Sequence, residues 1–493
     1  MAQEASARFD TDGDWERLFV GGEWRRAPDN DRIHVENPAT RERIASVPKA
    51  SAADVDEAYA AAREAQPEWA AQPPQVRAEV VQKAMGVVEE HQEDLEGVLV
   101  AEGGSTLTKA HVELDLLAPG MMAEAATFPT RAQGTHANST IPGRENEIHR
   151  EPVGVVGVIS PWNVPFHLSM RAVAPAVALG NAVVLKPAPE TPIAGGLALA
   201  RVFEAAGLPP GVLNVVPGNG AETGEAVASH PDANVVSFTG STEVGKRVAQ
   251  NAVENLALPA LELGGNNPQL VLADADLDLA VDAGVFGSFF HQGQICISIN
   301  RHLVHESLYD EYVERLADRA EALTVGDPAK GSDVGPVINE SQRDEMLRFV
   351  EESVEAGARV VAGGDSDDLF VEPTVLADAT NDMPVARNEH FGHIAPVIPF
   401  SDDEEAVELA NDTDYGLTAS VISADLDRAK RVAGRVEAGM VHVNDQPIND
   451  EPHVPFGGVK GSGLGRYNGE AIMREFTEER WVSLQHDRRE YPL

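Results

Sequence analysis

The sequence predicts an α/β protein in which helices cover both faces of a parallel β-sheet and a second α/β unit follows. Between residues 153 and 272, apolar runs of about four to eight residues alternate with helical stretches of about a dozen. This alternation is typical of right-handed βαβ units, which build parallel sheets. Because 493 residues are too many for a single hydrophobic core, we expect at least two domains.

The expected elements of the alternating stretch follow one another in strand–helix order. Strands are expected at residues 153–160, 182–185, 212–216, 235–239, 258–263 and 269–272, and helices at 167–179, 193–206, 222–229 and 243–255. Ligands of such sheets bind at the carboxyl ends of the strands. Binding residues are therefore expected in the segments that directly follow these strands.

The chain before this stretch is polar at first and then helical. Residues 1–50 contain short strand-like runs, and helices are expected over residues 51–69, with Ser51 as N-cap, and 76–104. The segment 127–150 looks extended and interrupts the first domain.

The chain after residue 270 predicts a second α/β stretch that reaches to about residue 465. Its strands are expected at residues 301–304, 360–362, 397–400, 419–422 and 439–443. The tail at 481–485 looks like another exposed strand. Two extended pieces outside an α/β body suggest strand pairing between subunits.

The charge balance indicates adaptation to high salt. Asp and Glu number 80 against 38 Lys and Arg, a net charge of -42. In dilute buffer such a charge repels itself, but in molar salt the Debye length falls to about 3 Å and screens the repulsion. The balance resembles that of proteins from salt-accumulating extreme halophiles. It argues against nucleic acid or an anionic membrane as a partner.

The rest of the composition favours a cytoplasmic protein. The N-terminal residues do not resemble a secretory signal, and no apolar run approaches the roughly 20 residues of a membrane span. One cysteine permits no internal disulfide, which fits a reducing compartment. The 15 histidines are not clustered at ligand spacing, so no metal site is expected.

Cys296 is the only cysteine, and it lies 34 residues after Glu262. A lone buried cysteine is usually an inert small hydrophobe, and a glutamate at a strand end is often a helix cap or an ion-pair partner. Together the two suggest a nucleophilic thiol and a general base, since a partly buried Glu can be tuned toward neutral pH.

Other residues with chemical potential follow the predicted strands. Asn163 lies between two prolines, which would fix its amide as a donor to an oxyanion, although a local turn hydrogen bond is an equally good interpretation. The Gly240–Gly245 turn opens a helix and could bind a phosphate, with Lys186 nearby, or could be an ordinary capped turn.

Seven short motifs occur in one order along the chain and resemble the aldehyde dehydrogenase superfamily from about residue 18 to 485. Three stretches of the sequence are most similar to the benzaldehyde/vanillin dehydrogenase branch: residues 263–268, 291–296 and 449–453. The seven motifs are Pro161-Trp162-Asn163, Lys186-Pro187, Phe238-Thr239-Gly240-Ser241, Glu262-Leu263-Gly264-Gly265, Gly293-Gln294-Ile295-Cys296, Glu389-His390-Phe391-Gly392 and Pro455-Phe456-Gly457-Gly458.

The resemblance implies oxidation of an aldehyde to a carboxylic acid with NAD(P)+. Cys296 would form a thiohemiacetal and then a thioester, the Asn163 amide and the Cys296 N–H would hold the oxyanion, and Glu262 would activate water. The implied cofactor-binding residues are Ser160, Trp162, Lys186, Gly240, Ser241, Gly245, Leu263, Glu389 and Phe391. The implied substrate-pocket residues are Leu168, Arg171, Phe290, Ile295, Ile297 and Phe456.

Some residues depart from the family pattern. Asn266 replaces the usual Lys, as in the aromatic-aldehyde branch, and His393 stands where Pro is usual. Pro189 occupies the place of the Glu that favours NAD, with Glu190 one residue further on, so NAD is expected and NADP stays open. Arg171 either attracts a polar substituent of the ring or forms a salt bridge at the channel mouth.

The resemblance also implies a domain division and an assembly. Residues 1–126 and 151–264 would form a Rossmann-like cofactor-binding domain, and 265–465 the catalytic domain. Segments 127–150 and 470–493 would form a small β element that joins subunits into a homodimer or homotetramer.

Other functions fit the same sequence. An aliphatic aldehyde or a semialdehyde could be the substrate. A CoA-acylating member would generally lack the glutamate that Glu262 supplies. A catalytically silent binding homologue would have no need of the Cys296, Glu262 and Asn163 set.

Overall fold

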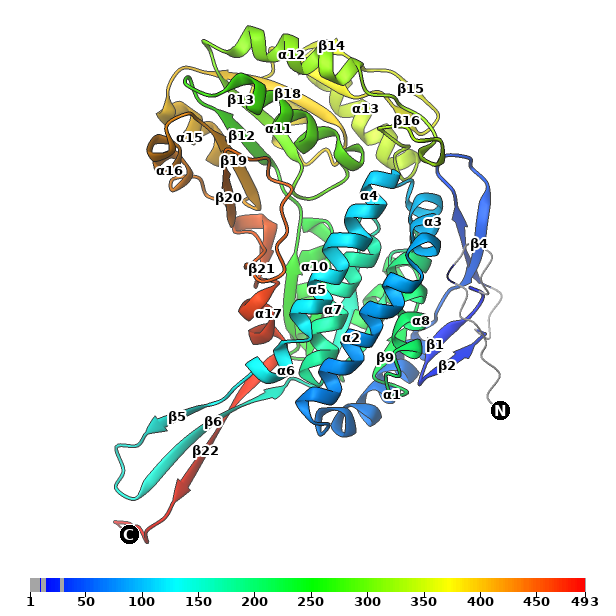
Figure 1. Cartoon of the computed structure of the whole chain (residues 1–493), viewed down its shortest axis with the longest axis vertical. Helices are drawn as coiled ribbons and strands as arrows, with labels where there is room; N and C mark the ends of the chain where they lie inside the picture. The colour runs from blue at the N-terminus through cyan, green and yellow to red at the C-terminus, as the bar shows by residue number, and fades with distance from the viewer. Residues whose placement is uncertain (1–8, 10–14, 27–30, 493) are drawn as a thin grey trace.

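The computed structural model describes residues 9, 15–26 and 31–492, so parts of the expected segment 1–126 and the last residue of 470–493 lie outside the described residues. Within them, two large sheets form the cores of two α/β units, and a three-stranded arm projects from the first unit (Figure 1). The predicted α/β fold with parallel sheets is confirmed.

The first sheet has the strand order β2-β1-β9-β8-β7-β10-β11-β21. Its five central strands (β9, β8, β7, β10 and β11) are parallel, whereas β1 and β2 at one edge and β21 at the other are antiparallel to their neighbours. The strands are β1 (Leu18–Val20), β2 (Glu23–Arg25), β7 (Val155–Ile159), β8 (Ala182–Lys186), β9 (Leu213–Val215), β10 (Val235–Thr239), β11 (Leu258–Glu262) and β21 (Gly463–Leu464).

Helices cover both faces of this sheet because successive strand residues point to opposite sides. Val155 and Ile159 of β7 pack in one apolar cluster, and Val156 and Val158 pack in another. The first face carries α1 (Ala52–Ala70), α9 (Glu225–Ala228) and α10 (Thr242–Glu254); the second carries α2 (Pro74–Glu90), α7 (Pro165–Leu179) and α8 (Ala198–Ala205). Burial on both sides explains why these strands are continuous apolar runs.

The second sheet has the order β14-β17-β18-β13-β12-β19-β20. Only the edge strand β14 is antiparallel to its neighbour among the described residues. The expected strand at 269–272 belongs here as β12, and sequence reasoning missed β17. The elements are β12 (Asn267–Val271), α11 (Leu277–Phe289), β13 (Ile299–His305), α12 (Tyr309–Glu321), α13 (Glu340–Glu355), β14 (Arg359–Ala362), β17 (Thr374–Ala377), α14 (Pro384–Arg387), β18 (Ile394–Phe400), α15 (Asp403–Asn411), β19 (Thr418–Ile422), α16 (Leu426–Ala433) and β20 (Met440–Val443).

Several expected helices differ from those of the structure. The helix expected over residues 76–104 is two helices, because His91 leaves the helical region at φ -113° and ψ 24°. The helices expected at 193–206 and 222–229 both begin with π-helical turns. The remaining elements are β3 (Arg32–Glu36), β4 (Arg43–Pro48), α3 (Gln92–Gly103), α4 (Leu107–His111), the π-helix η1 (Val112–Leu117), α5 (Ala118–Ala125), α6 (Phe128–Arg131), η2 (Ile193–Leu197), η3 (Gly220–Gly224), η4 (Phe290–Gly293), η5 (Pro328–Lys330), β15 (Ser366–Asp367), β16 (Phe370–Val371), η6 (Lys460–Ser462) and α17 (Gly469–Glu475).

The two segments expected to be extended pair with each other. The arm consists of β5 (Thr135–Asn138), β6 (Arg144–Pro152) and β22 (Thr477–Gln485), in the order β22-β6-β5. In Figure 1 it extends away from both α/β units and ends near the C-terminus. Segments more than 300 residues apart in sequence are thus joined along a nine-residue ladder.

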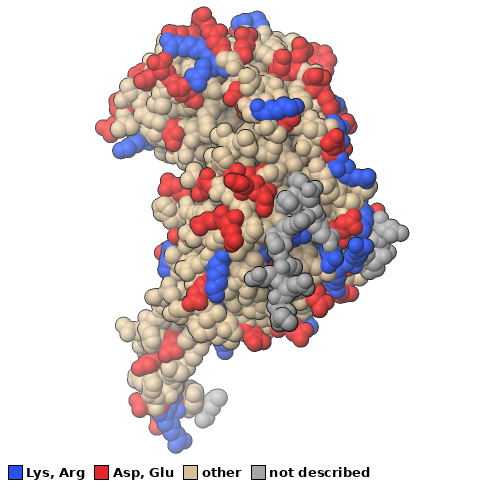
Figure 2. Space-filling view, turned by 45° about the vertical axis from the view of Figure 1, so that its right-hand side comes forward, with Lys and Arg blue, Asp and Glu red and all other residues tan. Residues whose placement is uncertain are grey.

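The surface reflects the composition of the chain. Figure 2 shows Asp and Glu side chains distributed over both α/β units and the arm, with fewer Lys and Arg between them. Among the described helices, none is long and apolar enough to span a membrane.

Candidate active site

Cys296 lies on a tightly wound loop that follows α11. His291, Gln292 and Gly293 have consecutive φ values of 50°, 57° and 65°. Left-handed backbone costs a non-glycine residue on the order of 1 kcal/mol or more. At Gly293 a side chain would also collide with the chain, because a Cβ there would lie 2.3 Å from the carbonyl oxygen of Gly392. The surrounding structure must therefore hold this loop in place.

The side chains of two glutamines supply much of that support. The Gln292 amide donates to the carbonyl oxygens of Gly104 at 2.9 Å and Pro336 at 2.8 Å. Gln294 Oε1 accepts the backbone N–H of Ile338 at 3.0 Å. These bonds join the Cys296 loop to both α/β units and fix its unusual conformation.

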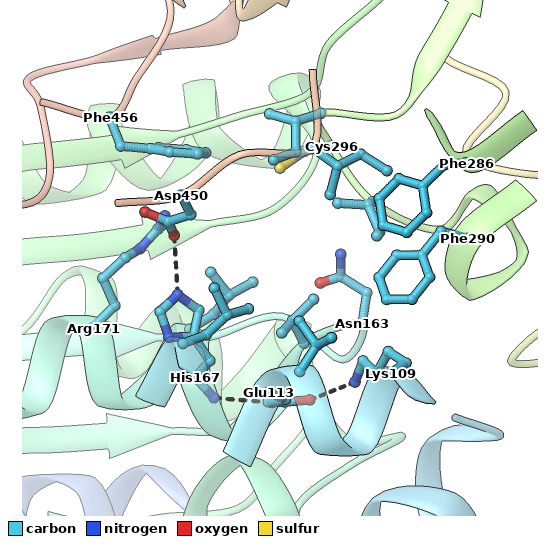
Figure 3. Close-up of a pocket in the computed structure, with 17 residues that line it drawn as sticks. Lys109, Glu113, Asn163, His167, Arg171, Phe286, Phe290, Cys296, Asp450 and Phe456 are labelled. Atoms are coloured by element: carbon cyan, nitrogen blue, oxygen red, sulfur yellow. Dashed lines mark hydrogen bonds and ion pairs between the residues drawn. The ribbon is translucent and has the colours of Figure 1, made fainter. Parts of the chain in front are cut away.

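Asn163 contacts the same loop from the amino end of α7. Its side-chain Nδ2 donates to the backbone carbonyl oxygen of Gln294 at 2.8 Å, and the backbone carbonyl oxygen of Asn163 lies 2.7 Å from His291 Nε2. The amide thus bonds across the site and not to its own turn, unlike in the local-turn interpretation. The second N–H of the amide is left for another acceptor, and Figure 3 shows the Asn163 amide beside the cavity that Cys296 lines.

Glu262 is the last residue of β11, and it is buried. Neither of its carboxyl oxygens has a hydrogen-bond partner among the described residues, so the cap and ion-pair interpretations of this residue fail. Burial raises the pKa of Glu262 to about 8, although the charges of Arg171 and Arg466 oppose the shift. A carboxyl with free oxygens and a pKa near neutrality can exchange protons during catalysis.

Cys296 is half-buried and faces the cavity. Burial raises the pKa of the Cys296 thiol to about 12; Arg171 opposes this shift, whereas Glu389 and Glu262 add to it. With so high a pKa, the thiol is protonated at neutral pH in the free site. The reason is that the cysteine lies between carboxylates in an apolar environment.

The cavity beside Cys296 has a volume of about 110 Å³ and mostly apolar walls. A cavity of roughly 150 Å³ lined by similar side chains binds benzene, so this one is sized for a single ring. Phe286 and Phe290 are stacked in its wall at a centroid distance of 4.7 Å. All six predicted pocket residues line it: Leu168, Arg171, Phe290, Ile295, Ile297 and Phe456. Cys296 and Asn163 also line it, whereas Glu262 does not.

Arg171 forms a salt bridge, one of the two roles considered for it. Its Nη1 lies 3.3 Å from Asp450 Oδ2, and its guanidinium faces the rings of Phe456 and Tyr467. His167 Nε2 is 3.0 Å from the same Asp450 oxygen. Burial alone would raise the pKa of Asp450, but His167 and Arg171 hold it well below its usual range. The charge of Arg171 is thus committed to a neighbour.

Sequence reasoning missed several cavity residues. Lys109 and Glu113 are spaced four residues apart, which normally indicates a solvent-exposed helical ion pair, and only the tertiary structure turns them inward. Asp450 lies in the stretch 449–453 that we singled out, and His167 begins the helix expected at 167–179, but neither residue was given a role. The remaining missed lining residues are Val112, Leu117, Val164, Phe286 and Ile448.

A second group of predicted residues gathers at the carboxyl edge of the first sheet. Ser160 follows β7, Lys186 ends β8, and Leu263 follows β11. Ser241 caps α10 by accepting the Val244 N–H, and the positive end of a helix dipole favours an anion near this helix start. The packing there is tight, because a Cβ on Gly245 would lie 2.3 Å from a Leu263 methyl group.

Glu389 approaches this edge from the second unit. Its Oε1 accepts the Gly265 N–H at 3.0 Å, and a Cβ on Gly264 would lie 2.1 Å from its other oxygen. Burial raises the pKa of Glu389 to about 7. Trp162 and Phe391 meet edge to face at 5.5 Å. Polar groups from both α/β units therefore border the carboxyl edge of the first sheet.

His393 joins the Glu389 segment to the Cys296 loop. It is buried, with Nδ1 3.0 Å from the Gln292 carbonyl oxygen and Nε2 2.7 Å from the Val371 carbonyl oxygen. Proline could make neither contact. The histidine that replaces the usual proline at position 393 thus has a structural role.

Comparisons with known proteins agree with this geometry. Residues 24–482 match the model of the aldehyde dehydrogenase family. The chain is 46% identical to benzaldehyde dehydrogenase YfmT of Bacillus subtilis, covering 97% of this chain and 98% of the relative. It is 47% identical to vanillin dehydrogenase of Corynebacterium glutamicum, covering 95% and 97%.

Solved structures show the same fold. Betaine aldehyde dehydrogenase from Staphylococcus aureus, solved in complex with NAD+, superimposes with a TM-score of 0.94 at 33% identity, covering 97% of this chain and 96% of that one. Both the sequence match and the structural match thus extend over nearly the whole chain. The chain therefore belongs to the aldehyde dehydrogenase family, and the resemblance inferred from its seven motifs is confirmed.

Proposed function

We propose that this enzyme oxidises aromatic aldehydes to carboxylic acids with NAD(P)+, in the manner of the benzaldehyde and vanillin dehydrogenases that it resembles. The observation that carries the proposal is the cavity beside Cys296, which has the size of one ring and contains stacked phenylalanines. Aromatic pairs favour contact with a further ring in offset or edge geometry. A long aliphatic chain would not fit so small a volume.

In this proposal Cys296 is the nucleophile. Its sulfur attacks the aldehyde carbon, and the thiol proton leaves as the thiohemiacetal forms. Because the pKa of the thiol is high, the attack requires this proton to leave to solvent, whereas Glu262 acts only in the hydrolysis that follows. The free N–H of the Asn163 amide and the Cys296 backbone N–H would bind the oxyanion, each donor contributing about 3 kcal/mol.

Glu262 completes the reaction in this proposal. Oxidation of the thiohemiacetal leaves a thioester on Cys296, which water must hydrolyse. The carboxylate of Glu262 takes the proton of that water as it attacks the acyl carbon, and the acid leaves with regeneration of the thiol. The unpartnered carboxyl oxygens are suited to hold such a water.

The cofactor would lie along the carboxyl edge of the first sheet, where the residues fit a dinucleotide. NAD(P)+ when bound supplies the two-electron oxidant. The start of α10 at Gly240–Gly245 would hold the pyrophosphate, Lys186 the adenosine ribose, and Glu389 the nicotinamide ribose. Burial lowers the pKa of Lys186 to about 8, and the charge of the nearby Glu190 opposes this shift. A carboxylate there would favour NAD over NADP.

The test is a matrix of rates in molar KCl, crossing NAD and NADP with benzaldehyde, vanillin and a short aliphatic aldehyde. We expect kcat/KM to favour both aromatic substrates by about tenfold or more, because the aliphatic substrate leaves the ring volume empty. A flat or aliphatic-favouring profile would leave the family membership intact but refute the aromatic substrate. The same matrix measures the preference between the two cofactors.

We further propose the domain roles implied by the resemblance. The first unit would bind the cofactor and the second would supply Cys296, with β21 of the predicted catalytic segment 265–465 contributing an edge strand to the first sheet. The arm would join subunits, because one edge of β22 pairs with no other strand of the described residues, and Trp481 on this strand is exposed. Homodimers or homotetramers are expected, and a cytoplasmic location stays a prediction.

We also propose that the protein is adapted to high salt. The melting temperature is expected to rise by on the order of 10 °C between about 0.1 M and about 2 M KCl, because salt screens the repulsion within a net charge of -42. Thermal unfolding followed by circular dichroism measures this rise. Sucrose, an uncharged osmolyte, serves as the control for general stabilisation. An equal rise in sucrose, or no rise in KCl, would contradict the adaptation.

A further inference from the structure

A buried ion pair lines the cavity on the wall formed by α4 and η1. Lys109 Nζ lies 2.5 Å from Glu113 Oε2, and both side chains are at most 2% exposed. The pair is placed where the helix changes from α to π geometry, at residues 111 and 112. π-Helical turns of this kind occur frequently at functional sites.

Both carboxylate oxygens of Glu113 have a hydrogen-bond donor, whereas the Lys109 ammonium has one acceptor among the described residues. Glu113 Oε1 accepts the His167 backbone N–H at 2.9 Å, and Oε2 accepts from Lys109, so both carboxylate oxygens are occupied. The ammonium of Lys109 has three N–H groups. Glu113 is its one partner among the described residues, so two N–H groups remain for a ligand.

The other charges in the cavity wall are committed elsewhere. Arg171 and His167 both bind Asp450. The rest of the lining is mostly aliphatic and aromatic. Arg171 keeps an unpartnered Nε, but its guanidinium is held against Asp450 and the rings of Phe456 and Tyr467. Among the described residues, the Lys109 ammonium therefore offers two donors that no such contacts hold.

Stability alone does not explain the pair. Burying two charges is costly, and replacing a buried ion pair with apolar residues is often neutral or stabilising. Burial lowers the pKa of Lys109, and Glu113 opposes this shift. The contact with the Glu113 carboxylate favours the charged form of Lys109 against this shift and places an N–H donor in an apolar cavity, which suits recognition of an acceptor oxygen.

We propose that Lys109, held by Glu113, donates a hydrogen bond to an oxygen substituent on the ring of the substrate. This inference rests on the proposed oxidation of aromatic aldehydes. In Figure 3 the pair and the Cys296 sulfur lie on opposite sides of Asn163, so a ring whose aldehyde carbon meets Cys296 would direct its far side toward Lys109. Because Lys109 and Glu113 are together neutral, hydroxyl and methoxy groups fit better than a carboxylate.

The test compares three substrates that differ at one ring position: benzaldehyde, 4-hydroxybenzaldehyde and 4-methylbenzaldehyde, with the 3-substituted isomers in parallel. The methyl group matches the hydroxyl in size but accepts no hydrogen bond. The double variant Lys109→Met/Glu113→Gln removes the ammonium without leaving an unpaired carboxylate. The amide oxygen that this change introduces can still accept the His167 N–H.

We expect the double variant to lose about 10- to 100-fold in kcat/KM for the better hydroxylated isomer, as is typical of a lost hydrogen bond to a charged group. Its rate with benzaldehyde and with the methylated substrates should change by less than about threefold. Binding of the product acids, followed by calorimetry, should show the same selective loss for hydroxybenzoate over methylbenzoate.

The single variant Glu113→Gln is the matched control, because it keeps Lys109 in the cavity. It should lose part of the preference for the hydroxylated substrate, because Lys109 loses the carboxylate that holds it, but the loss should be smaller than in the double variant. An unchanged ratio of hydroxylated to methylated substrate in the double variant would overturn the role of Lys109 while oxidation of benzaldehyde still stood. Failure of the wild type to oxidise any of the aldehydes would overturn the proposed function, and this inference with it.

Discussion

Cys296→Ala is expected to lower kcat/KM for aldehyde oxidation by about 10⁴-fold or more, because no other group can form the covalent intermediate. The chain contains a single cysteine, so no neighbouring thiol can substitute for it. The measurement is the rate of formation of reduced nicotinamide with benzaldehyde, made alongside a circular dichroism spectrum of the folded variant.

Cys296→Ser provides the matched control for the same position. A hydroxyl fills the same space but is a much weaker nucleophile than a thiol, so this variant should be nearly as slow as the alanine variant. Its folding should match that of the wild type, because the side chain is only half-buried. An alanine variant with full turnover would refute the covalent mechanism and leave only a binding role for the cavity.

Glu262→Gln is expected to separate the two halves of the reaction. The variant should form one equivalent of reduced nicotinamide per active site and then stall, because the thioester lacks the base that activates water. Steady-state turnover should fall by about 10²- to 10⁴-fold. Stopped-flow absorbance at high enzyme concentration would resolve the burst from the slow phase. Steady-state rates equal to those of the wild type would contradict the role of Glu262.

The same variant is expected to be more stable than the wild type above acidic pH. The pKa of Glu262 is raised from 4.5 to about 8 in the folded state, so its contribution to stability is present below about pH 4.5 and is lost as the pH rises toward 8. Glutamine does not ionise, so the gain should reach about 3 kcal/mol at pH 7. Urea unfolding at pH 5 and pH 7.5 measures it; an equal gain at both pH values would exclude ionisation as its cause.

The alternation of strands and helices predicted the core of the fold because it reflects burial on both faces of the sheet. Runs such as Val155–Ile159 are apolar throughout, and their period is visible without any tertiary information. The antiparallel edges, the break at His91 and the π-helical turns were not predictable. They depend on tertiary contacts and on backbone angles that the local sequence does not determine.

The sequence predicted some features of the candidate site but not others. Cys296, Asn163 and the six pocket residues meet at one cavity, whereas Glu262 does not line it but is near enough to add to the raised pKa of the Cys296 thiol. The sequence did not predict the protonation state of Cys296, because the high pKa of its thiol results from burial and from charged residues that are distant in sequence. Lys109 and Glu113 were missed for the same reason. A Lys and a Glu four residues apart have the same sequence pattern whether the pair is exposed to solvent or buried in a cavity.

The most direct test of the account is to mix Glu262→Gln with benzaldehyde and NAD+, quench the reaction, and measure the mass of the intact protein. The account predicts a gain equal to one benzoyl group, located in the peptide that contains Cys296, which is the only cysteine available for a thioester. The adduct should be absent without NAD+, and hydroxylamine should remove it. An unmodified protein after a completed burst of reduced nicotinamide would show that the acid forms without a Cys296 thioester, which contradicts the mechanism.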